Sequence, residues 1–200
     1  MAPSEQKIVV VGDGACGKTC LLLGFSRDEF PRDYVHTIFN TYSKHLMVNK
    51  RRIRLSLWDT AGQPEYDRIR PMAYHDTDVF LLCFALDRPD SFNNIHEKWL
   101  PEIRHFCPNV PIILVGTKKD LRGSTCANID TDSDSQRFEQ ISAEEGKYIA
   151  KKCAMFEYQE CSAETSAGVR EVFETAVRAV QYSAERRKLE RKRKPKCTII

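Results

Sequence analysis

The chain has 200 residues, of which 42% are hydrophobic, and it carries a formal net charge of +3. A chain of this length and composition can bury a substantial core in a single domain. No stretch approaches 18 uninterrupted apolar residues, and the N-terminus lacks the regions of a secretory signal, which argues against a membrane-spanning or secreted protein and favours the cytoplasm.

Apolar runs and amphipathic segments alternate along the chain. The expected strands cover residues 7–11, 42–48, 53–58, 79–84, 112–116 and 155–158, and the expected helices cover 18–27, 91–106, 142–152 and 165–184. Four polar residues at 49–52 favour a hairpin between the second and third strands. This alternation predicts a doubly wound, mostly parallel α/β sheet of six strands with one antiparallel hairpin strand. Ligands of such sheets bind at the carboxyl ends of the strands.

Residues 12–19 read GDGACGKT, a complete G-x-x-x-x-G-K-[ST] phosphate loop, directly after the apolar run at 8–11. In this order of strand, glycine turn and helix, backbone N–H groups point into one anion-sized concavity. An ordinary glycine turn is the alternative, and the flanking strand and helix disfavour it. We therefore predict a polyphosphate site in which Lys18 reaches the β- and γ-phosphates and Thr19 holds Mg²⁺.

The base-binding motif follows a later strand. The run at 117–120 reads Thr-Lys-Lys-Asp, and Asp120 can accept two hydrogen bonds from guanine, whereas adenine offers no such donor pair. Downstream, the run 161–163 reads Cys-Ser-Ala, and a backbone N–H there can meet guanine O6. The ligands are therefore expected to be GTP and GDP. A P-loop kinase would instead need an arginine-rich lid and an adenine site, and neither is seen.

A polar segment at 122–141 has the composition of a surface insertion. Aspartates at every second position from 130 to 134 alternate like calcium ligands. An EF-hand loop would have Gly and Glu where this chain has Ser135 and Ile141, so calcium binding is disfavoured.

The eight cysteines show neither CxxC pairs nor His partners at zinc spacing, so free thiols are expected. Cys83 lies in an apolar run and is expected to be buried. Cys16 and Cys20 lie in or beside the phosphate loop, where Lys18 and a helix N-terminus could lower a thiol pKa and make the thiol redox-sensitive.

Taken together, the chain resembles the Ras-like small GTPases, and specifically the Rho family, from about Gln6 to Ile200. The insertion lies where Rho proteins carry a characteristic extra helix. The matching runs cover 12–22, 58–63, 66–68, 76–78, 105–116 and 168–173.

The resemblance implies a GTP/GDP switch that hydrolyses GTP and recruits effectors when GTP is bound, with control of the actin cytoskeleton, cell shape or motility. Gln63 would orient the attacking water, and Gly14 would leave the space that Gln63 and an incoming arginine need; with Lys18 these are the expected catalytic residues. No arginine is evident in the phosphate loop, so fast hydrolysis would need the arginine of an activating protein. The alternative is a pseudo-GTPase that stays loaded, which the presence of Gly14, Thr37 and Gln63 disfavours.

Two irregular segments, 28–41 and 60–75, adjoin the phosphate loop in the expected fold and are predicted to be mobile. The resemblance implies that Thr37 and Asp59 join the loop threonine at Mg²⁺, and that the N–H of Gly62 meets the γ-phosphate. Loss of these contacts on hydrolysis would release both segments.

The resemblance also assigns Phe30 to the guanine and Tyr34 to a cover over the phosphates. The residues expected to bind GTP or GDP are Gly12, Asp13, Gly14, Ala15, Cys16, Gly17, Lys18, Thr19, Cys20, Phe30, Tyr34, Thr37, Asp59, Gly62, Thr117, Lys118, Asp120, Ser162 and Ala163. The residues expected to face effectors or to move with the switch are Tyr34, Val35, Thr37, Phe39, Tyr42 and Tyr66.

Some positions depart from the family pattern. Glu164 replaces the usual Lys after Ser-Ala, and guanine selectivity is expected to survive because the main contact comes from the backbone of Ala163. His36 stands where Pro commonly precedes the switch threonine; a solvated loop histidine is favoured over a source of pH dependence. Asn40 and Thr41 replace an acidic-Asn pair, which leaves the downstream partner open.

Residues 186–196 carry a local charge of +7, which leaves −4 on the rest of the chain and favours a separate electrostatic tail. The final four residues, beginning with Cys197, fit the C-a-a-X prenylation pattern, and the hydrophobic last residue favours geranylgeranyl. We expect a GTP-binding domain over 1–182 and a basic, flexible tail over 183–200 that attaches reversibly to the anionic cytoplasmic face of the plasma membrane. A nuclear-localisation or nucleic-acid tail is the alternative.

By resemblance, the expected partners are a guanine nucleotide exchange factor, a GTPase-activating protein with an arginine finger, a guanine nucleotide dissociation inhibitor and effector proteins. We expect a monomer with no nucleic-acid partner.

Overall fold

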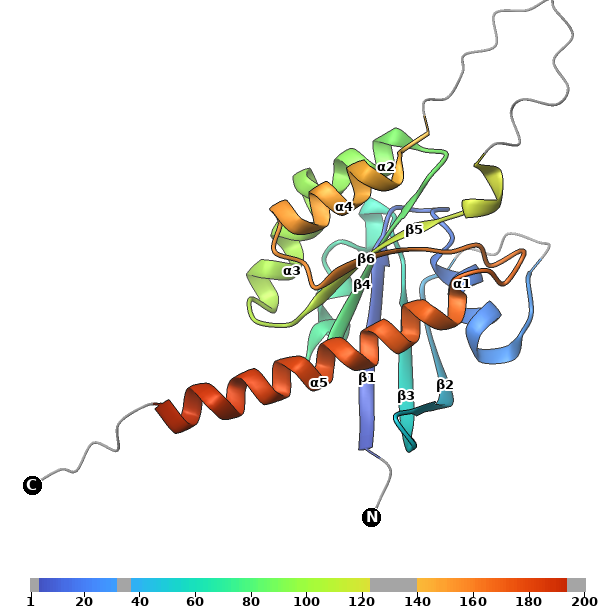
Figure 1. The fold of residues 1–200 in the computed structure, drawn as a ribbon. Helices are drawn as coiled ribbons and strands as arrows, with labels where there is room; N and C mark the ends of the chain where they lie inside the picture. The colour runs from blue at the N-terminus through green and yellow to red at the C-terminus, as the bar shows by residue number, and fades with distance from the viewer. Residues whose placement is uncertain (1–3, 32–36, 123–139, 194–200) are drawn as a thin grey trace, which may run out of the picture.

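The structure is a computed structural model that describes residues 4–31, 37–122 and 140–193, with side chains described to residue 190. Its centre is a six-stranded sheet in the order β2-β3-β1-β4-β5-β6 (Figure 1). β2 and β3 are antiparallel and every other neighbouring pair is parallel, which confirms the predicted architecture. The strands are β1 (Ser4–Gly12), β2 (Phe39–Val48), β3 (Arg51–Thr60), β4 (Val79–Ala85), β5 (Ile112–Thr117) and β6 (Glu157–Glu160).

The hairpin between β2 and β3 is tighter than expected. The two strands remain paired up to Val48 opposite Arg51, so the connection has two residues rather than four. Asn49 and Lys50 both adopt positive φ, 51° and 61°. Two left-handed residues in succession form the kind of turn whose twist matches that of the strands it joins.

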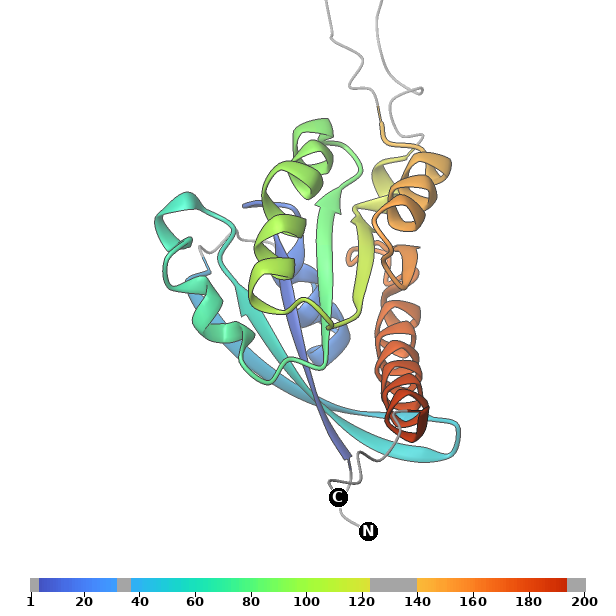
Figure 2. The ribbon, with the colours of Figure 1, turned by 90° about the vertical axis from the view of Figure 1, so that its left-hand side faces the viewer.

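One face of the sheet is covered by α1 (Lys18–Arg27) and α5 (Val169–Arg193), as Figure 2 shows. The rings of Phe25 in α1 and Phe173 in α5 stack with their centroids 3.7 Å apart. Both rings join a buried cluster with alternate side chains of the central strands, so this layer is held by apolar packing.

The opposite face is covered by a second helical layer. The helix predicted over 91–106 forms as one helical run that starts slightly earlier and contains a π-helical turn. At the centre of this layer, the fully buried Trp99 packs in one cluster with Phe80 and Phe84 of β4. The elements of the layer are α2 (Pro89–Asn94), the π-turn η3 (Ile95–Trp99), α3 (Leu100–Phe106) and α4 (Ala143–Lys152).

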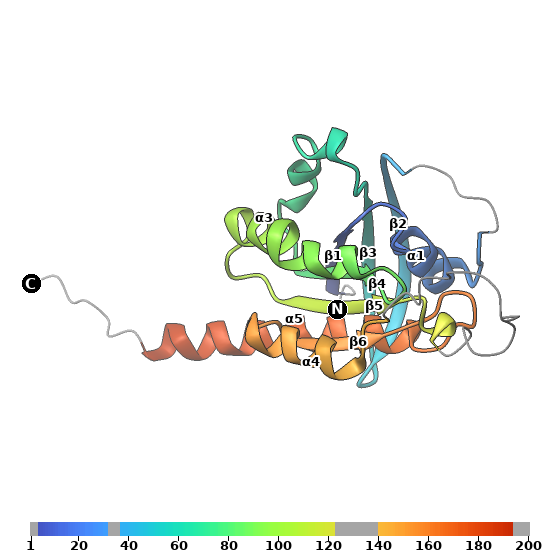
Figure 3. The same cartoon turned by 90° about the horizontal axis from the view of Figure 1, so that it is seen from above.

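Helix α5 is longer than its apolar stripe indicated. It continues to Arg193, nine residues beyond the predicted end at 184, so residues 185–193 are helical. Arg, Lys, Leu and Glu in this stretch all favour helix, and Arg186 pairs with Glu190 one turn later at 3.5 Å. Figure 3 shows these turns running beyond the sheet. Neither α5 nor any other helix in the described ranges carries an apolar stretch long enough to cross a bilayer.

β6 begins two residues later than predicted, because Met155 fills the core before the strand starts. The helix before it, α4, begins within one residue of the predicted start, and the spacing of Ser142 and Glu145 indicates the capping box that opens it. The Ser142 Oγ accepts from the backbone N–H of Glu145 at 3.2 Å, and the Glu145 carboxylate accepts from the backbone N–H of Ser142 at 2.8 Å.

Most of the predicted insertion, 123–139, lies outside the described residues, but the fold holds its two ends together. Arg122 donates to the carbonyl of Ile141 at 2.7 Å, and the side-chain amide of Gln140 donates to the carbonyl of Leu121 at 2.9 Å. The chain therefore leaves and rejoins the domain at one place.

Three short 3₁₀ turns complete the description, η1 (Pro64–Tyr66), η2 (Arg70–Tyr74) and η4 (Lys119–Leu121). The first two lie in the segment 60–75, which packs against the sheet in part: Tyr74 is 2% exposed. Its mobility stays a prediction.

Candidate functional site

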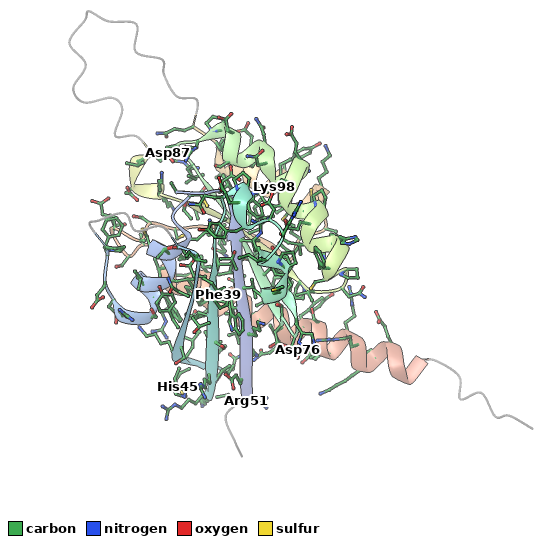
Figure 4. All side chains as sticks on the ribbon, turned by 180° about the vertical axis from the view of Figure 1, so that it is seen from behind. Phe39, His45, Arg51, Asp76, Asp87 and Lys98 are labelled. Atoms are coloured by element: carbon green, nitrogen blue, oxygen red, sulfur yellow. The ribbon has the colours of Figure 1, made fainter. Side chains whose placement is uncertain are left out.

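A cleft of about 460 Å³ lies at the carboxyl ends of the strands, where ligands were predicted to bind. Figure 4 labels Asp87, which follows β4 at this end of the sheet, and Arg51, which starts β3 at the opposite end. Thirteen of the predicted nucleotide-binding residues line the cleft, together with the predicted catalytic residue Gln63: Gly14, Ala15, Gly17, Lys18, Thr19, Cys20, Phe30, Thr37, Gly62, Thr117, Lys118, Asp120 and Ala163.

Asp13, another predicted residue, lies outside the cleft lining and holds the phosphate loop in place. The carboxylate of Asp13 accepts hydrogen bonds from the Asn94 amide and the Trp99 indole, both at 2.7 Å, so this side chain ties the loop to the helical layer. Tyr34, Val35, His36 and Cys197 lie outside the described residues. Among the described residues, the predicted nucleotide-binding residues that do not line the cleft are Gly12, Asp13, Cys16, Asp59 and Ser162.

The loop at 12–19 folds as predicted and needs its glycines. Gly12 has φ +142°, and a Cβ there would lie 2.1 Å from the carbonyl oxygen of Cys83. Gly17 has φ +86° and precedes α1 without a side-chain cap from the described residues, which leaves N–H groups of the first turn open to an anion. Lys18 is 6% exposed and its ammonium donates to the carbonyls of Gly12 at 2.7 Å and Asp13 at 2.6 Å. The loop thus holds a cation against its own backbone.

Three predicted metal ligands meet beside this loop. The hydroxyl oxygens of Thr19 and Thr37 lie 2.8 Å apart, and the Thr19 hydroxyl donates to Asp59 Oδ2 at 2.7 Å. Asp59 is fully buried, and its Oδ1 has no hydrogen-bond partner among the described residues. Burial raises the pKa of this carboxyl, opposed mainly by the Thr19 hydrogen bond and the charge of Lys18. A buried carboxylate oxygen without a donor beside two hydroxyls is a site that suits a hard cation.

The segment that carries Gln63 lies against the phosphate loop. A Cβ on Gly62 would lie 2.3 Å from the carbonyl oxygen of Gly12, so only glycine permits this approach. A Cβ on Gly14 would lie 3.7 Å from the side chain of Gln63, which is ordinary contact. The glutamine is therefore adjacent to the loop, and any larger side chain at 14 would compete with it for space.

The base-binding motifs meet at the far end of the cleft. The Thr117 hydroxyl is shared by the carbonyls of Cys16 at 2.6 Å and Phe84 at 2.9 Å, which joins the motif to the phosphate loop. Lys118 adopts φ 60° and its ammonium pairs with Asp87 at 3.1 Å. The turn places Asp120 in the cleft wall with Phe30 and Ala163.

The comparisons with known proteins agree with this geometry. The family model described as the Ras family matches residues 7–182. The Rho-related GTP-binding protein RhoB from Homo sapiens is 55% identical over 179 residues, which cover 90% of each chain, and RhoB from Mus musculus and from Rattus norvegicus gives the same values. The chain belongs to the Rho family of small GTPases. This Rho-family GTPase is a GTP/GDP switch with GTP-hydrolysing activity.

Two thiols of the GTPase behave differently from expectation. Cys16 is fully buried, and burial raises the pKa of its thiol although the charge of Lys18 opposes the change. Burial also raises the pKa of Cys20. Both shifts are opposite to the lowered pKa that was considered for these thiols, because desolvation outweighs the nearby cation. Cys83 is buried as predicted.

A buried arginine cluster, which sequence reasoning missed, connects the segment 60–75 to the helical layer. The Arg70 side chain is 1% exposed; it donates to Glu102 at 2.9 Å and to the carbonyl of Ala61 at 3.2 Å. Its guanidinium lies over the Trp99 ring at 4.4 Å. Burial acts to lower the pKa of Arg70, but the pairing with Glu102 outweighs it and leaves the pKa raised, so the group stays charged. No local pattern marks Arg70 as buried, because its partner Glu102 lies 32 residues away in the sequence.

The predicted effector residues divide between two surfaces. Phe39 and Tyr66 line a separate apolar groove of about 300 Å³, with Ile38, Ile69 and Met72 among its walls. Tyr42 instead lines the nucleotide cleft. Phe39, labelled in Figure 4, is 43% exposed although it is a large apolar side chain.

Proposed function

We propose that this GTPase binds GTP and GDP in the 460 Å³ cleft, with the phosphates on the loop at 12–19 and the guanine at Asp120. The observation that carries the proposal is the convergence of Thr19, Thr37 and Asp59 beside this loop. Thr19 and Thr37 line the same cleft as the base motif. Asp120 gives the preference for guanine, because its carboxylate can accept two hydrogen bonds from guanine and adenine offers no such donor pair. Competition of ATP and GTP for the purified protein tests this part.

We assign a Mg²⁺ ion to Thr19 and Thr37, with Asp59 acting through water. The residues fit the ion: all three offer oxygen, and Asp59 Oδ1 lacks a donor among the described residues. When bound, Mg²⁺ neutralises charge on the phosphates. Thr37 and Asp59 serve to hold the site; Lys18, fixed by two carbonyls, adds a second positive charge.

Hydrolysis in this proposal depends on positioning. Gln63 orients the attacking water, and Gly14 leaves space beside it. The described lining of the cleft contains no arginine, so an activating protein supplies one for the stimulated reaction. Thr37 and Gly62 respond to the γ-phosphate, and its loss releases the segments 28–41 and 60–75.

Substitution of Gln63 tests the catalytic assignment. Gln63→Leu should keep GTP affinity within about twofold and abolish phosphate release stimulated by a Rho GTPase-activating domain. Gln181→Leu, the same change on α5, is the matched control and should hydrolyse at the wild-type rate. Stimulated turnover by Gln63→Leu would contradict the role, and failure of both wild type and variant to release phosphate would favour the pseudo-GTPase alternative.

The remaining proposals concern partners and place. The apolar groove at Phe39 and Tyr66 supports docking of effectors, and a pull-down with the Gln63→Leu form would identify them together with exchange factors and dissociation inhibitors.

The basic run at 186–196 and the box at Cys197 support prenylation and a cytoplasmic protein that attaches to anionic membrane. Sedimentation of the prenylated chain with phosphatidylserine vesicles tests attachment. Control of the actin cytoskeleton follows only by family resemblance.

A further inference from the structure

The structure brings an arginine from outside the phosphate loop to its edge. Arg88 follows β4 and lies 74 residues from Gly14 in the sequence, yet its Nη1 donates to the Gly14 carbonyl oxygen at 3.3 Å. Gly14 lines the cleft and is adjacent to Gln63. We propose that Arg88 is a catalytic residue that supplies a guanidinium in cis to the γ-phosphate during unstimulated hydrolysis.

The backbone of Arg88 is fixed relative to the cleft. Its N–H donates to the carbonyl of Ala85 at 3.0 Å, and its carbonyl accepts from the hydroxyl of Ser91 at 2.7 Å. Ser91 is 1% exposed, so this anchor is part of the core. The base of the arginine is therefore held in place, and only its side chain needs to move.

The elements on both sides of Arg88 are also tied to the cleft. Asp87 pairs with Lys118 of the base motif at 3.1 Å, and Asn94, at the end of α2, donates to Asp13 of the phosphate loop at 2.7 Å. These contacts hold both ends of the segment 87–94 against the nucleotide-binding motifs.

The side chain of Arg88 is free to exchange its partner. It is exposed, and the neutral carbonyl of Gly14 is a weak acceptor for a guanidinium. Hydrogen bonds from arginine to phosphate oxygens are charge-assisted and about twice as strong as neutral ones. A γ-phosphate bound at the loop would thus offer Arg88 a stronger acceptor than the Gly14 carbonyl that it contacts.

In the reaction, the water oxygen attacks the γ-phosphorus and the bond from this phosphorus to the β–γ bridging oxygen breaks. The electron pair of that bond stays on the leaving GDP, and the proton of the water passes to the inorganic phosphate. Arg88 forms no bond in this step; it stabilises charge on the equatorial oxygens and the bridging oxygen. An arginine in cis supports unstimulated rates about 20-fold above those of GTPases without one.

The proposal rests on the hydrolysis assigned to this cleft, and single-turnover phosphate release from the full chain without an activating protein tests it. Arg88→Ser should lower the rate about 10- to 30-fold and change the dissociation rate of GDP by less than twofold. Arg88→Lys should recover only part of the rate, because an ammonium lacks the planar fork. Arg51→Ser, an exposed arginine at the far end of the sheet, is the matched control and should leave the rate unchanged.

A second measurement does not depend on turnover. GDP with aluminium fluoride mimics the planar transferring phosphoryl group, and the wild-type chain alone should bind it, whereas Arg88→Ser should not. Wild-type rates and wild-type binding of this mimic by Arg88→Ser would overturn the proposal. If both Gln63→Leu and Arg88→Ser hydrolysed GTP at the wild-type rate, the proposed catalytic site itself would be wrong. If Arg88→Ser did so and Gln63→Leu did not, only the role of Arg88 would be excluded.

Discussion

The hydroxyl oxygens of Thr19 and Thr37 lie 2.8 Å apart, although 18 residues separate them in the chain. This contact joins the start of α1 to the segment 28–41, and it includes Asp59 through the bond from Thr19. The position of Thr37 is thus set by the same group that is proposed to hold the metal.

Removal of the Thr37 hydroxyl should therefore weaken the metal site. We expect Thr37→Ala to raise the Mg²⁺ concentration for half-maximal hydrolysis by about tenfold, the effect of losing one hydrogen-bonding group of about 1.4 kcal/mol. Thr37→Ser keeps the hydroxyl and should behave as wild type. A titration of Mg²⁺ against phosphate release checks this, and equal curves for the two variants would contradict it.

Position 14 should tolerate alanine better than valine. A Cβ alone meets Gln63 at an ordinary 3.7 Å, whereas the two further carbons of valine must displace the Gln63 side chain. Gly14→Val should lower unstimulated hydrolysis about 10- to 100-fold with GTP affinity retained, and Gly14→Ala should lose less. Phosphate release and nucleotide dissociation are measured on the same samples. Slower hydrolysis with unchanged dissociation indicates displacement of Gln63, whereas faster dissociation as well indicates a damaged nucleotide site.

The buried arginine cluster should be a point of stability. Arg70→Lys keeps the charge but loses the fork that reaches Glu102 and the Ala61 carbonyl together. We expect the free energy of unfolding to fall by about 1–3 kcal/mol in urea denaturation. Arg68→Lys, an exposed arginine in the same segment, should change it by less than about 0.5 kcal/mol. Equal effects would show that burial at Arg70 is not the cause.

Gly146 in α4 should not accept a methyl group, despite the higher helix propensity of alanine. A Cβ there would lie 2.3 Å from the ring of Tyr158. Gly146→Ala should destabilise the protein by about 1–3 kcal/mol through overpacking, whereas Lys147→Ala at the exposed neighbour should be close to neutral. In a double-mutant cycle, Tyr158→Leu should remove most of the penalty. Additive effects would argue against a clash.

Stability should decline at alkaline pH because of buried thiols. Burial raises the pKa of Cys161 from 9.0 to about 12. The unfolded chain therefore loses this proton first, so the contribution is complete below about pH 9 and is lost as the pH rises toward 12. Between pH 8 and 10.5, Cys161→Ala should lose about 2 kcal/mol less unfolding free energy than wild type. Parallel losses in the two proteins would contradict the assignment.

The features that could be predicted from the sequence are local ones. The phosphate loop, the capping box at Ser142 and the buried central strands depend on residues close together in the chain, so spacing alone indicates them. The end of α5 was misjudged because its apolar stripe stops near 180, whereas the following residues favour helix through propensity and ion pairs. A strongly charged composition is thus compatible with a helix as well as with an irregular tail.

The features that could not be predicted depend on long-range contacts. Asp13 was assigned to the nucleotide because it lies within the motif, but its carboxylate bonds to Trp99, 86 residues away. Arg70 and Arg88 occur in stretches without periodicity, and their partners Glu102 and Gly14 lie 32 and 74 residues away. A motif specifies its backbone; the side chains inside it depend on the tertiary structure.

The paired ends of the segment 123–139 have a consequence for how such proteins diverge. Because Arg122 and Gln140 fasten the two ends to the domain, the points at which the stretch leaves and rejoins the fold are set by residues outside it. Evolution can therefore replace this stretch wholesale while the adjoining guanine motif stays intact. The fold thus provides two fixed attachment points, and related proteins can carry different insertions there without any change to the residues of the nucleotide site.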